Sequence, residues 1–194
     1  MKIYKIDLDY IKFLYQSDNR VQYNSDYNDS KNENRPYIGI VLSINGLNYF
    51  APLEHPRPKH ANLKSNPHIY KIKNGRLGLI GLNNMIPVPV EALISFDIKK
   101  DPNSAILQSQ YVECKNNWNV IQRKANDIYR RRTIKPNKFE QDVYCDFKLL
   151  ETECKKYIST KGYSLNQNSI SQPSLSSIQK NAINKAKQHN RNGR

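Results

Sequence analysis

Residues 37–53 decide the fold, and they read Tyr37-Ile38-Gly39-Ile40-Val41-Leu42-Ser43-Ile44-Asn45-Gly46-Leu47-Asn48-Tyr49-Phe50-Ala51-Pro52-Leu53. The stretch contains two apolar runs rich in β-branched and aromatic residues, which are typical of core strands. Asn45-Gly46 lies between the runs and supplies the two positive φ angles of a type I′ turn. The sequence therefore predicts an antiparallel hairpin in the core of a sheet.

Shorter apolar runs on either side extend this sheet. Strands are expected at 2–6, 68–73, 76–80, 85–90 and 93–98. Asn74-Gly75 joins the second of these runs to the third, and prolines confine the fourth to a sheet edge or an irregular strand. Asp7 is expected to cap a helix that ends near residue 15, and a polar loop follows over 16–36. The first 98 residues thus predict a small, curved, mainly antiparallel, β-barrel-like core.

The second half of the chain changes to helical periodicity. Asp101-Pro102 is typical of a helix start, and the apolar residues over about 105–131 follow helical spacing. Asn116-Asn117 weakens the middle of that region, so it can form one helix or two. Pro136 interrupts the pattern, and one further helix is expected from about 137 to 158. The predicted fold class is α+β, with strands first and two C-terminal helices last.

The chain ends in a basic tail. Beyond Glu153 there is no acidic residue, and the remaining Lys and Arg are spread among Ser, Asn and Gln. Residues 1–158 are therefore expected to form the folded domain and 159–194 a flexible tail, with a weak basic helix over 175–190. The tail either makes auxiliary contacts with RNA or is a solvated extension without a specific partner.

The overall composition favours a polyanionic partner. The chain has 31 Lys+Arg against 17 Asp+Glu, a formal charge of +14 and a pI of about 9.7. Such an excess attracts nucleic acid, although a soluble protein with a basic surface has the same composition. Cys114, Cys145 and Cys154 are widely spaced, which indicates reduced structural thiols. No signal peptide or membrane-spanning run is evident, so the chain is expected to be cytoplasmic, with no membrane partner.

The segment after the predicted hairpin carries the densest chemistry in the chain. It reads Glu54-His55-Pro56-Arg57-Pro58-Lys59-His60 and is called the 54–60 segment below. Metal-independent RNA cleavage needs a base for the ribose 2′-OH proton, an acid for the departing 5′-oxygen and cations for the phosphate. The segment has side chains for all three tasks, which favours a ribonuclease or an RNA-binding module. Alternatively, a polar, proline-rich stretch of mixed charge can be a surface connector.

The residue types suggest how these tasks are divided. Arg57 and Lys59 are expected to bind the scissile phosphate, and in an extended segment both would point to one side. His55 is expected to exchange a proton with the 2′-OH and to be oriented by Glu54, which could also be the base itself. His60 is expected to support the leaving group or to position the strand. Spacing alone leaves open which histidine is the base and which is the acid.

Residues outside the segment are expected to assist it. Tyr10, on the first helix, either lines the RNA groove or is a half-buried structural residue. The basic residues expected to extend the RNA contact are Lys71, Lys73, Arg76, Arg130, Arg131 and Arg132. The three consecutive arginines also suit the dipole at a helix end. No metal site is expected, because Arg57 and Lys59 would repel a cation held by the histidines, and no cofactor is expected either.

Several short sequence motifs follow one another in a particular order and spacing. This arrangement identifies a protein family more specifically than any single motif does. The motifs are Met1–Tyr4, Tyr10–Leu14, Arg35–Leu42, Tyr49–Leu53, the following Pro/Lys/His loop, Leu77–Ile80 and Asn83–Pro87. Over about residues 1–155, the chain resembles the ToxN/AbiQ family of type III toxin–antitoxin ribonucleases. The resemblance implies a MazF/Kid-like fold and a metal-independent endoribonuclease that leaves a 2′,3′-cyclic phosphate. It also implies a repeated RNA pseudoknot as antitoxin, a closed, cyclic protein–RNA assembly and a role in phage defence.

The 54–60 segment is also where the chain departs from the family pattern. Family members typically have Thr/Ser-Ser-Pro-Lys after Ala-Pro-Leu, whereas this chain has Glu54, His55, Pro56 and Arg57. Either a histidine base has replaced the hydroxyl groups, or cleavage is lost and the chain is a non-catalytic RNA-binding protein. Tyr10 matches a family position near the active groove. A DNA-binding regulator is a third hypothesis, but no helix-turn-helix pattern supports it.

Overall fold

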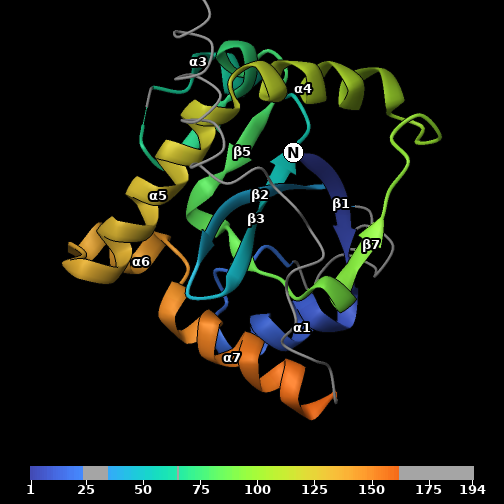
Figure 1. Ribbon diagram of the computed structural model, residues 1–194. Helices are drawn as coiled ribbons and strands as arrows, with labels where there is room; N and C mark the ends of the chain where they lie inside the picture. The colour runs from blue at the N-terminus through green and yellow to red at the C-terminus, as the bar shows by residue number, and fades with distance from the viewer. Residues whose placement is uncertain (24–34, 65, 162–194) are drawn as a thin grey trace, which may run out of the picture.

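The architecture is a single antiparallel sheet with helices around it. The computed structural model describes residues 1–23, 35–64 and 66–161 (Figure 1). The seven-stranded sheet has the order β4-β5-β3-β2-β1-β7, and β6 pairs with β3 outside this path. The strands are β1 Lys2–Ile6, β2 Tyr37–Ile44, β3 Leu47–Glu54, β4 Ile69–Lys71, β5 Leu79–Gly81, β6 Ile86–Pro87 and β7 Leu93–Ser95. The predicted α+β class is confirmed.

The central hairpin is confirmed in both strands and turn. Strands β2 and β3 pair from Tyr37↔Pro52 to Ile44↔Leu47, and the turn residues Asn45 and Gly46 have φ angles of 52° and 74°. The register shifts between Gly39 and Leu42. A Cβ at Gly39 would lie only 2.1 Å from Cδ1 of Phe50, so the absence of a side chain lets the aromatic ring pack against the strand.

The sheet is open instead of closed into a barrel. Strands β4 and β7 form the two ends of the strand path, and no pairing joins them among the described residues. The pair expected at 68–73 and 76–80 exists, but it is shorter: Ile69↔Gly81 and Lys71↔Leu79 are its limits. The strand stops at Lys71 because Ile72 turns into the core, where its N–H donates to the carbonyl of Gly78. The last predicted strand, 93–98, is also shortened, to β7.

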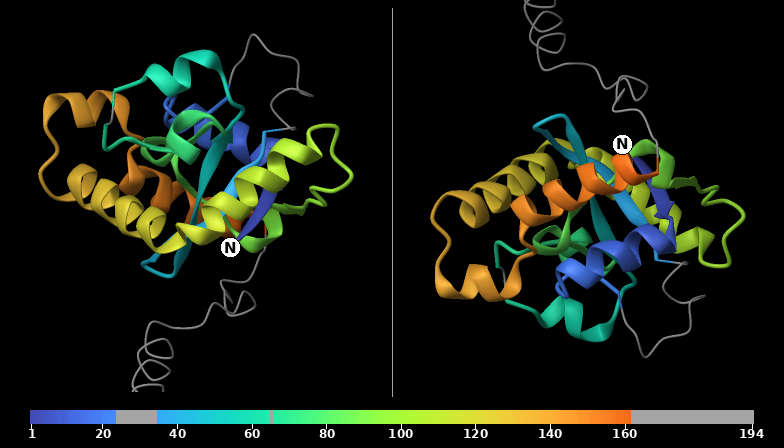
Figure 2. Two further views of the ribbon diagram at one scale, coloured as in Figure 1. Left: turned by 90° about the horizontal axis from the view of Figure 1, so that it is seen from above. Right: turned by 90° about the horizontal axis from the view of Figure 1, so that it is seen from below.

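Helices cover opposite ends of the sheet. They are α1 Leu8–Ser17, α3 Pro58–Asn62, α4 Ser104–Asn116, α5 Trp118–Ile134, α6 Lys138–Val143 and α7 Phe147–Thr160, with 3₁₀ turns η1 Ile72–Gly75, η2 Leu82–Asn84 and η3 Val90–Ala92. Helices α3 and α4 lie at one end, and α1 and α7 run side by side at the other (Figures 1 and 2). Asp7 caps α1 as predicted, because its Oδ1 accepts from the N–H groups of Asp9 and Tyr10.

The helical half differs from prediction at one joint. The region over 105–131 forms two helices that meet at Asn117, one of the two alternatives. The single helix expected over 137–158 is wrong, because the chain breaks between α6 and α7. There, the N–H of Cys145 donates to the carbonyl of Asn83, and the N–H of Asp146 donates to Oδ2 of Asp18 at 2.6 Å. These long-range bonds replace the local bonds of a continuous helix.

The hydrophobic core is formed by residues of the sheet and of helices α1, α4, α5 and α7. Cys114, Cys145 and Cys154 are buried free thiols, as predicted.

Within the described ranges, no helix is long and apolar enough to cross a membrane. Most of the polar loop over 16–36 and nearly all of the predicted tail, with its basic helix over 175–190, lie outside the described residues, so the domain limits stay a prediction.

Candidate active site

The 54–60 segment lies at the end of the sheet that α3 and α4 cover. Strand β3 ends at Glu54, which pairs with Leu79 of β5. The chain then passes through His55 and Pro56 to Arg57, the residue that precedes α3, with Pro58 in the first turn of that helix. Lys59 and His60 are therefore helical. The expectation that Arg57 and Lys59 alternate along an extended segment is wrong, because Pro58 is accommodated by starting a helix.

Exposure divides the segment into two groups. The side chains of His55, Arg57 and Lys59 are exposed, and Glu54 is half-buried. An imidazole, a guanidinium and an ammonium therefore reach solvent within five residues of chain. All three are therefore accessible to nucleic-acid phosphate. This is the grouping on which the predicted chemistry depends.

His60 lies beneath this surface. Its exposed fraction is 1%, and its Nε2 is 3.8 Å from Oε2 of Glu54. Burial lowers the pKa of His60, an effect that Glu54 opposes and that the positive charges of Arg57 and Lys59 reinforce. The imidazole is thus neutral near pH 7. Of the two roles expected for His60, support of the leaving group is contradicted, because helix α3 turns its side chain inward. It can still position Glu54.

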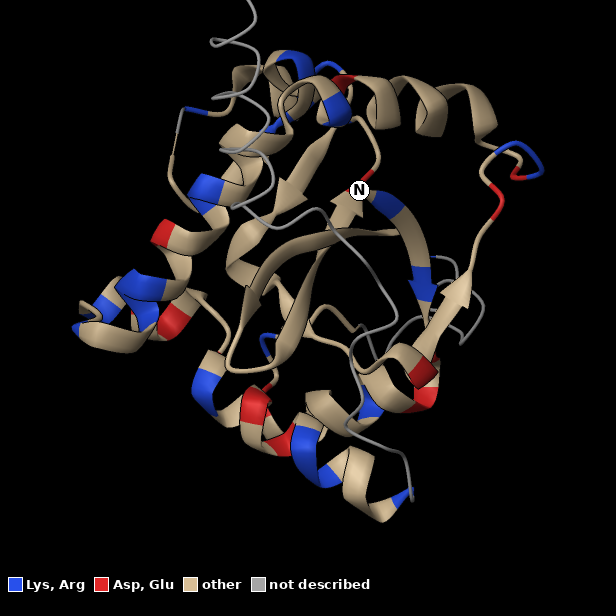
Figure 3. Ribbon diagram, viewed as in Figure 1, with Lys and Arg blue, Asp and Glu red and all other residues tan. Residues whose placement is uncertain are grey.

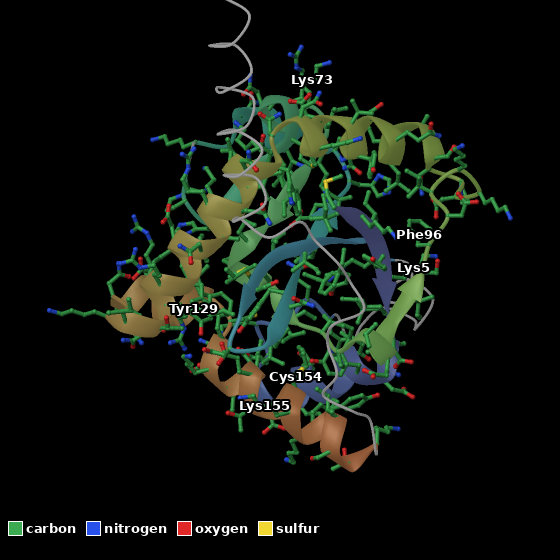
Figure 4. All side chains as sticks on the ribbon, in the orientation of Figure 1. Lys5, Lys73, Phe96, Tyr129, Cys154 and Lys155 are labelled. Atoms are coloured by element: carbon green, nitrogen blue, oxygen red, sulfur yellow. The ribbon has the colours of Figure 1, made fainter. Side chains whose placement is uncertain are left out.

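The η1 turn packs against α3 and brings two predicted RNA-binding residues to this end of the molecule. Lys73 lies within η1 and points outward above α4 (Figure 4), and Arg76 follows it with an exposed side chain. Lys71 instead donates from Nζ to the carbonyls of Ala61 and Leu63, at 3.0 and 2.9 Å. In this conformation, Lys71 fastens the end of α3, so its predicted RNA contact is replaced by a structural one.

The arginines of α5 form a separate basic surface. Arg130 is exposed, as is Arg131, whose Nη1 lies 3.5 Å from Oε1 of Glu140. Arg132 is mostly buried and pairs with Asp146 at 2.8 Å. Figure 3 shows Lys and Arg gathered on the last turns of α5. Arg130 and Arg131 remain available for RNA, whereas Arg132 holds α5 to the start of α7.

Tyr10 is a core residue. Its side chain has no exposed surface, its hydroxyl donates to the carbonyl of Pro87 at 2.6 Å, and its ring packs edge-on against Tyr157. Helix α1 lies at the end of the sheet opposite α3 (Figure 1). The expectation that Tyr10 lines the RNA groove is therefore wrong, and its alternative, a structural tyrosine, fits. Its apolar spacing with Ile11 and Leu14 already allowed that interpretation.

We expect Tyr10→Phe to leave the rate of RNA cleavage unchanged and to lower the free energy of unfolding by about 1–2 kcal/mol. The variant removes only the hydroxyl and leaves the Pro87 carbonyl without this donor. Urea unfolding and a cleavage assay on the same preparation measure the two effects. A loss of cleavage at unchanged stability would show that the Tyr10 hydroxyl takes part in cleavage.

Gln110 is a buried residue that bonds to the 54–60 segment, and it is not among the site residues predicted from the sequence. Gln110 of α4 is 2% exposed, and its Nε2 donates to the carbonyls of Glu54 and Leu77. The sequence carries a signal for it: Gln110 follows Leu107 by three residues and precedes Cys114 by four, which places a polar residue on the buried face of its helix. A glutamine there requires a hydrogen-bond partner.

Comparisons with known proteins agree on one family. Residues 2–155 match the family described as toxin ToxN of the type III toxin–antitoxin system. The chain is 33% identical over 166 residues to the endoribonuclease ToxN of Bacillus thuringiensis subsp. kurstaki, which covers 80% of this chain and 84% of that protein.

Solved structures are similar as well. The lactococcal anti-phage endoribonuclease AbiQ, of a type III toxin–antitoxin system, has a TM-score of 0.70 and 27% identity, over 81% of this chain and 98% of AbiQ. A type III toxin that is inhibited by a non-coding RNA pseudoknot has a TM-score of 0.66 and 30% identity, over 80% of this chain and 96% of the toxin.

Proposed function

Because this chain belongs to the ToxN family of type III toxin–antitoxin toxins, we propose that it is an endoribonuclease toxin inhibited by an RNA pseudoknot and used in phage defence. The observation that carries the proposal is the exposed group of His55, Arg57 and Lys59 at the end of β3, in a chain that matches the family over residues 2–155. RNA is both its substrate and its inhibitor.

The reaction we propose is an intramolecular transesterification. His55 takes the proton of the ribose 2′-OH, the 2′-oxygen attacks the adjacent phosphorus, and the bond to the 5′-oxygen breaks as that oxygen takes a proton from water. The products are a 2′,3′-cyclic phosphate and a 5′-hydroxyl. Arg57 and Lys59 stabilise the charge on the phosphate oxygens. Glu54 orients the segment through its contact with His60.

Surfaces beyond the segment have separate roles in the proposal. Lys73 and Arg76 follow the RNA strand away from the scissile phosphate, and Arg130 and Arg131 contact the antitoxin at a distance from the site. Such divided contacts favour a closed, cyclic protein–RNA assembly. Residues 1–158 would form the RNA-cutting domain, whose curved sheet we relate to MazF and Kid toxins, and 159–194 would add basic contacts. The chain would work in the cytoplasm, where its RNA partners are.

Cleavage of total RNA in the presence of a chelator tests the proposal. We expect the purified chain to yield new fragments with 5′-hydroxyl ends, and the purified antitoxin RNA to suppress them. A short RNA that contains one mapped site, but has a 2′-deoxy nucleotide before the scissile phosphate, is the control and should stay intact. Fragments with 5′-phosphate ends, or cleavage of the deoxy control, would contradict the mechanism.

A non-catalytic RNA-binding protein is the second candidate, and one observation favours it. Glu54 and His55 occupy positions where the family pattern has hydroxyl groups, and the half-buried Glu54 carboxylate places a negative charge beside the phosphate-binding residues. The same experiment separates the candidates. Retention of RNA on the chain without any new ends would establish binding alone.

A further inference from the structure

Gln110 joins α4 to the start of the candidate site. Its side-chain amide lies between two backbone segments, with Nε2 at 3.1 Å from the carbonyl oxygen of Glu54 and 2.7 Å from that of Leu77. A carboxamide NH₂ has two hydrogens, so this geometry uses both. Because the residue is 2% exposed, water does not readily replace either bond. The helix therefore holds the carbonyl that immediately precedes His55.

The backbone at Gly78 packs closely against the carbonyl of Glu54. Gly78 has a φ of 96°, and a Cβ at this position would lie 2.1 Å from the carbonyl oxygen of Glu54 and 3.0 Å from Nε2 of Gln110. Because Gly78 has no Cβ, its backbone can approach both the end of β3 and the amide of Gln110 this closely. A displacement of Glu54 would thus have to move the Leu77–Gly78 backbone as well.

We propose that Gln110 is a positioning residue for RNA cleavage: it fixes the backbone from which His55 and Arg57 project. The inference rests on the proposed function for its effect on rate. His55 is exposed and follows the held carbonyl directly, so the direction of its side chain depends on the Glu54–His55 peptide. Pro56 stiffens the chain between this point and Arg57. Placement errors of about 1 Å can cost about 100-fold in rate.

Gln110→Met tests the inference, because methionine keeps the approximate volume and removes both donors. On a short RNA with one mapped site, we expect kcat to fall by about 10- to 100-fold and KM to stay within about twofold. Arg57 and Lys59 would still attract the phosphate, so binding would persist while alignment is lost. A kcat within about twofold of the unchanged chain would overturn the proposal.

Gln122→Met is the matched control. Gln122 is a half-buried glutamine on the neighbouring helix α5, and its Nε2 donates to the carbonyl of Ile40 in β2, far along the sheet from Glu54. The variant loses one glutamine–carbonyl bond, of 3.4 Å, and leaves the bonds to Glu54 and Leu77 in place. We expect its kcat to be unchanged. An equal fall of kcat in both variants would mean that general destabilisation is the cause, and the proposal would fail.

Gln110→Glu gives an independent readout through pH. A carboxylate would face two carbonyl oxygens and repel them, whereas a protonated carboxyl can donate one bond. The ratio of variant to unchanged kcat should therefore rise as the pH falls from about 8 to about 5.5. A ratio that stays flat or falls would contradict a donor role. This test decides the question even if Gln110→Met does not fold.

Hydrogen exchange separates a failure of this inference from a failure of the proposed function. If the unchanged chain does not cut RNA, the proposed function fails, and amide exchange of residues 54–62 then decides the role of Gln110. Faster exchange there in Gln110→Met, but not in Gln122→Met, would support positioning. Equal exchange in all three chains would overturn it.

Discussion

The His55→Ala chain is expected to cut RNA about 10²- to 10⁴-fold more slowly than the unchanged chain, and to lose growth inhibition in a host without the antitoxin. The reason is that His55 is the exposed imidazole of the 54–60 segment and the proposed acceptor of the 2′-OH proton. Its removal leaves the buried His60, whose side chain faces the interior. Single-turnover cleavage of a short RNA measures the effect.

The Arg57→Ala variant tests the proposed contact between the guanidinium and the scissile phosphate. We expect a loss of about 10²- to 10³-fold in kcat, because the guanidinium stabilises charge that develops on the phosphate. Arg57→Lys should recover part of the rate, since it keeps the charge but not the planar fork. Arg123→Ala, an exposed arginine on α5, is the control for the loss of one positive charge and should cut at nearly the normal rate.

Stability separates a catalytic role from a structural one in these variants. His55 and Arg57 are exposed, so truncation of either should change the free energy of unfolding by no more than about 0.5 kcal/mol. Full cleavage by both variants would remove the 54–60 segment from the mechanism. Loss of cleavage together with loss of folding would assign these residues to the fold instead.

The Glu151→Gln chain is expected to lose about 2–4 kcal/mol of unfolding free energy. Glu151 is a buried carboxylate of α7. Its Oε1 accepts from the hydroxyls of Tyr129 and Tyr49 at 2.6 and 3.0 Å, and its Oε2 accepts from Asn45 at 3.1 Å and Lys148 at 3.3 Å. One residue thus links β3, the hairpin turn, α5 and α7; Figure 4 shows Tyr129 at this junction.

Glutamine fits the space but not the hydrogen bonds. Its carbonyl can replace Oε1 and accept from both tyrosines, but its NH₂ would then face the donors of Asn45 and Lys148. Two donor-to-donor contacts replace two bonds in a buried site. Glu153→Gln is the matched control on the same helix. The Glu153 side chain is 13% exposed and pairs with the exposed Lys156 at 3.4 Å. Because water screens the ammonium, this pair should contribute no more than about 1 kcal/mol.

The same variant predicts a change in acid stability. Burial by itself raises the pKa of Glu151, but hydrogen bonds from Tyr129, Asn45 and Tyr49, together with Lys148, outweigh it and lower the pKa below 4.5. When the pKa of a carboxyl is lower in the folded chain than in the unfolded chain, its ionisation stabilises the fold above about pH 4.5. This stabilisation is lost as the pH falls through the folded pKa. Urea unfolding between about pH 7 and 3 should show a smaller acid-dependent loss in Glu151→Gln than in the unchanged chain. A loss at pH 7 no larger than that of Glu153→Gln would contradict the role of the network.

Local patterns predicted much of the fold because they report short-range physics. Asn45-Gly46 between two apolar runs specifies a turn whatever surrounds it, and Asp7 caps α1 with its own neighbours. The break between α6 and α7 could not be predicted in this way. It depends on Asp18 and Asn83, which are distant in sequence and which bond to the backbone of Asp146 and Cys145.

The candidate site shows the same division. The sequence by itself predicts the chemistry at residues 54–60, because two histidines and two cations follow directly after a core strand. Only the tertiary structure decided which side chains can act: it exposes His55 and Arg57, buries His60 and Tyr10, engages Lys71 with carbonyls and brings Gln110 of α4 to the carbonyl of Glu54. The physical reason is that the residue type sets what a side chain can do, whereas burial and hydrogen-bond partners depend on segments that meet only in the folded chain.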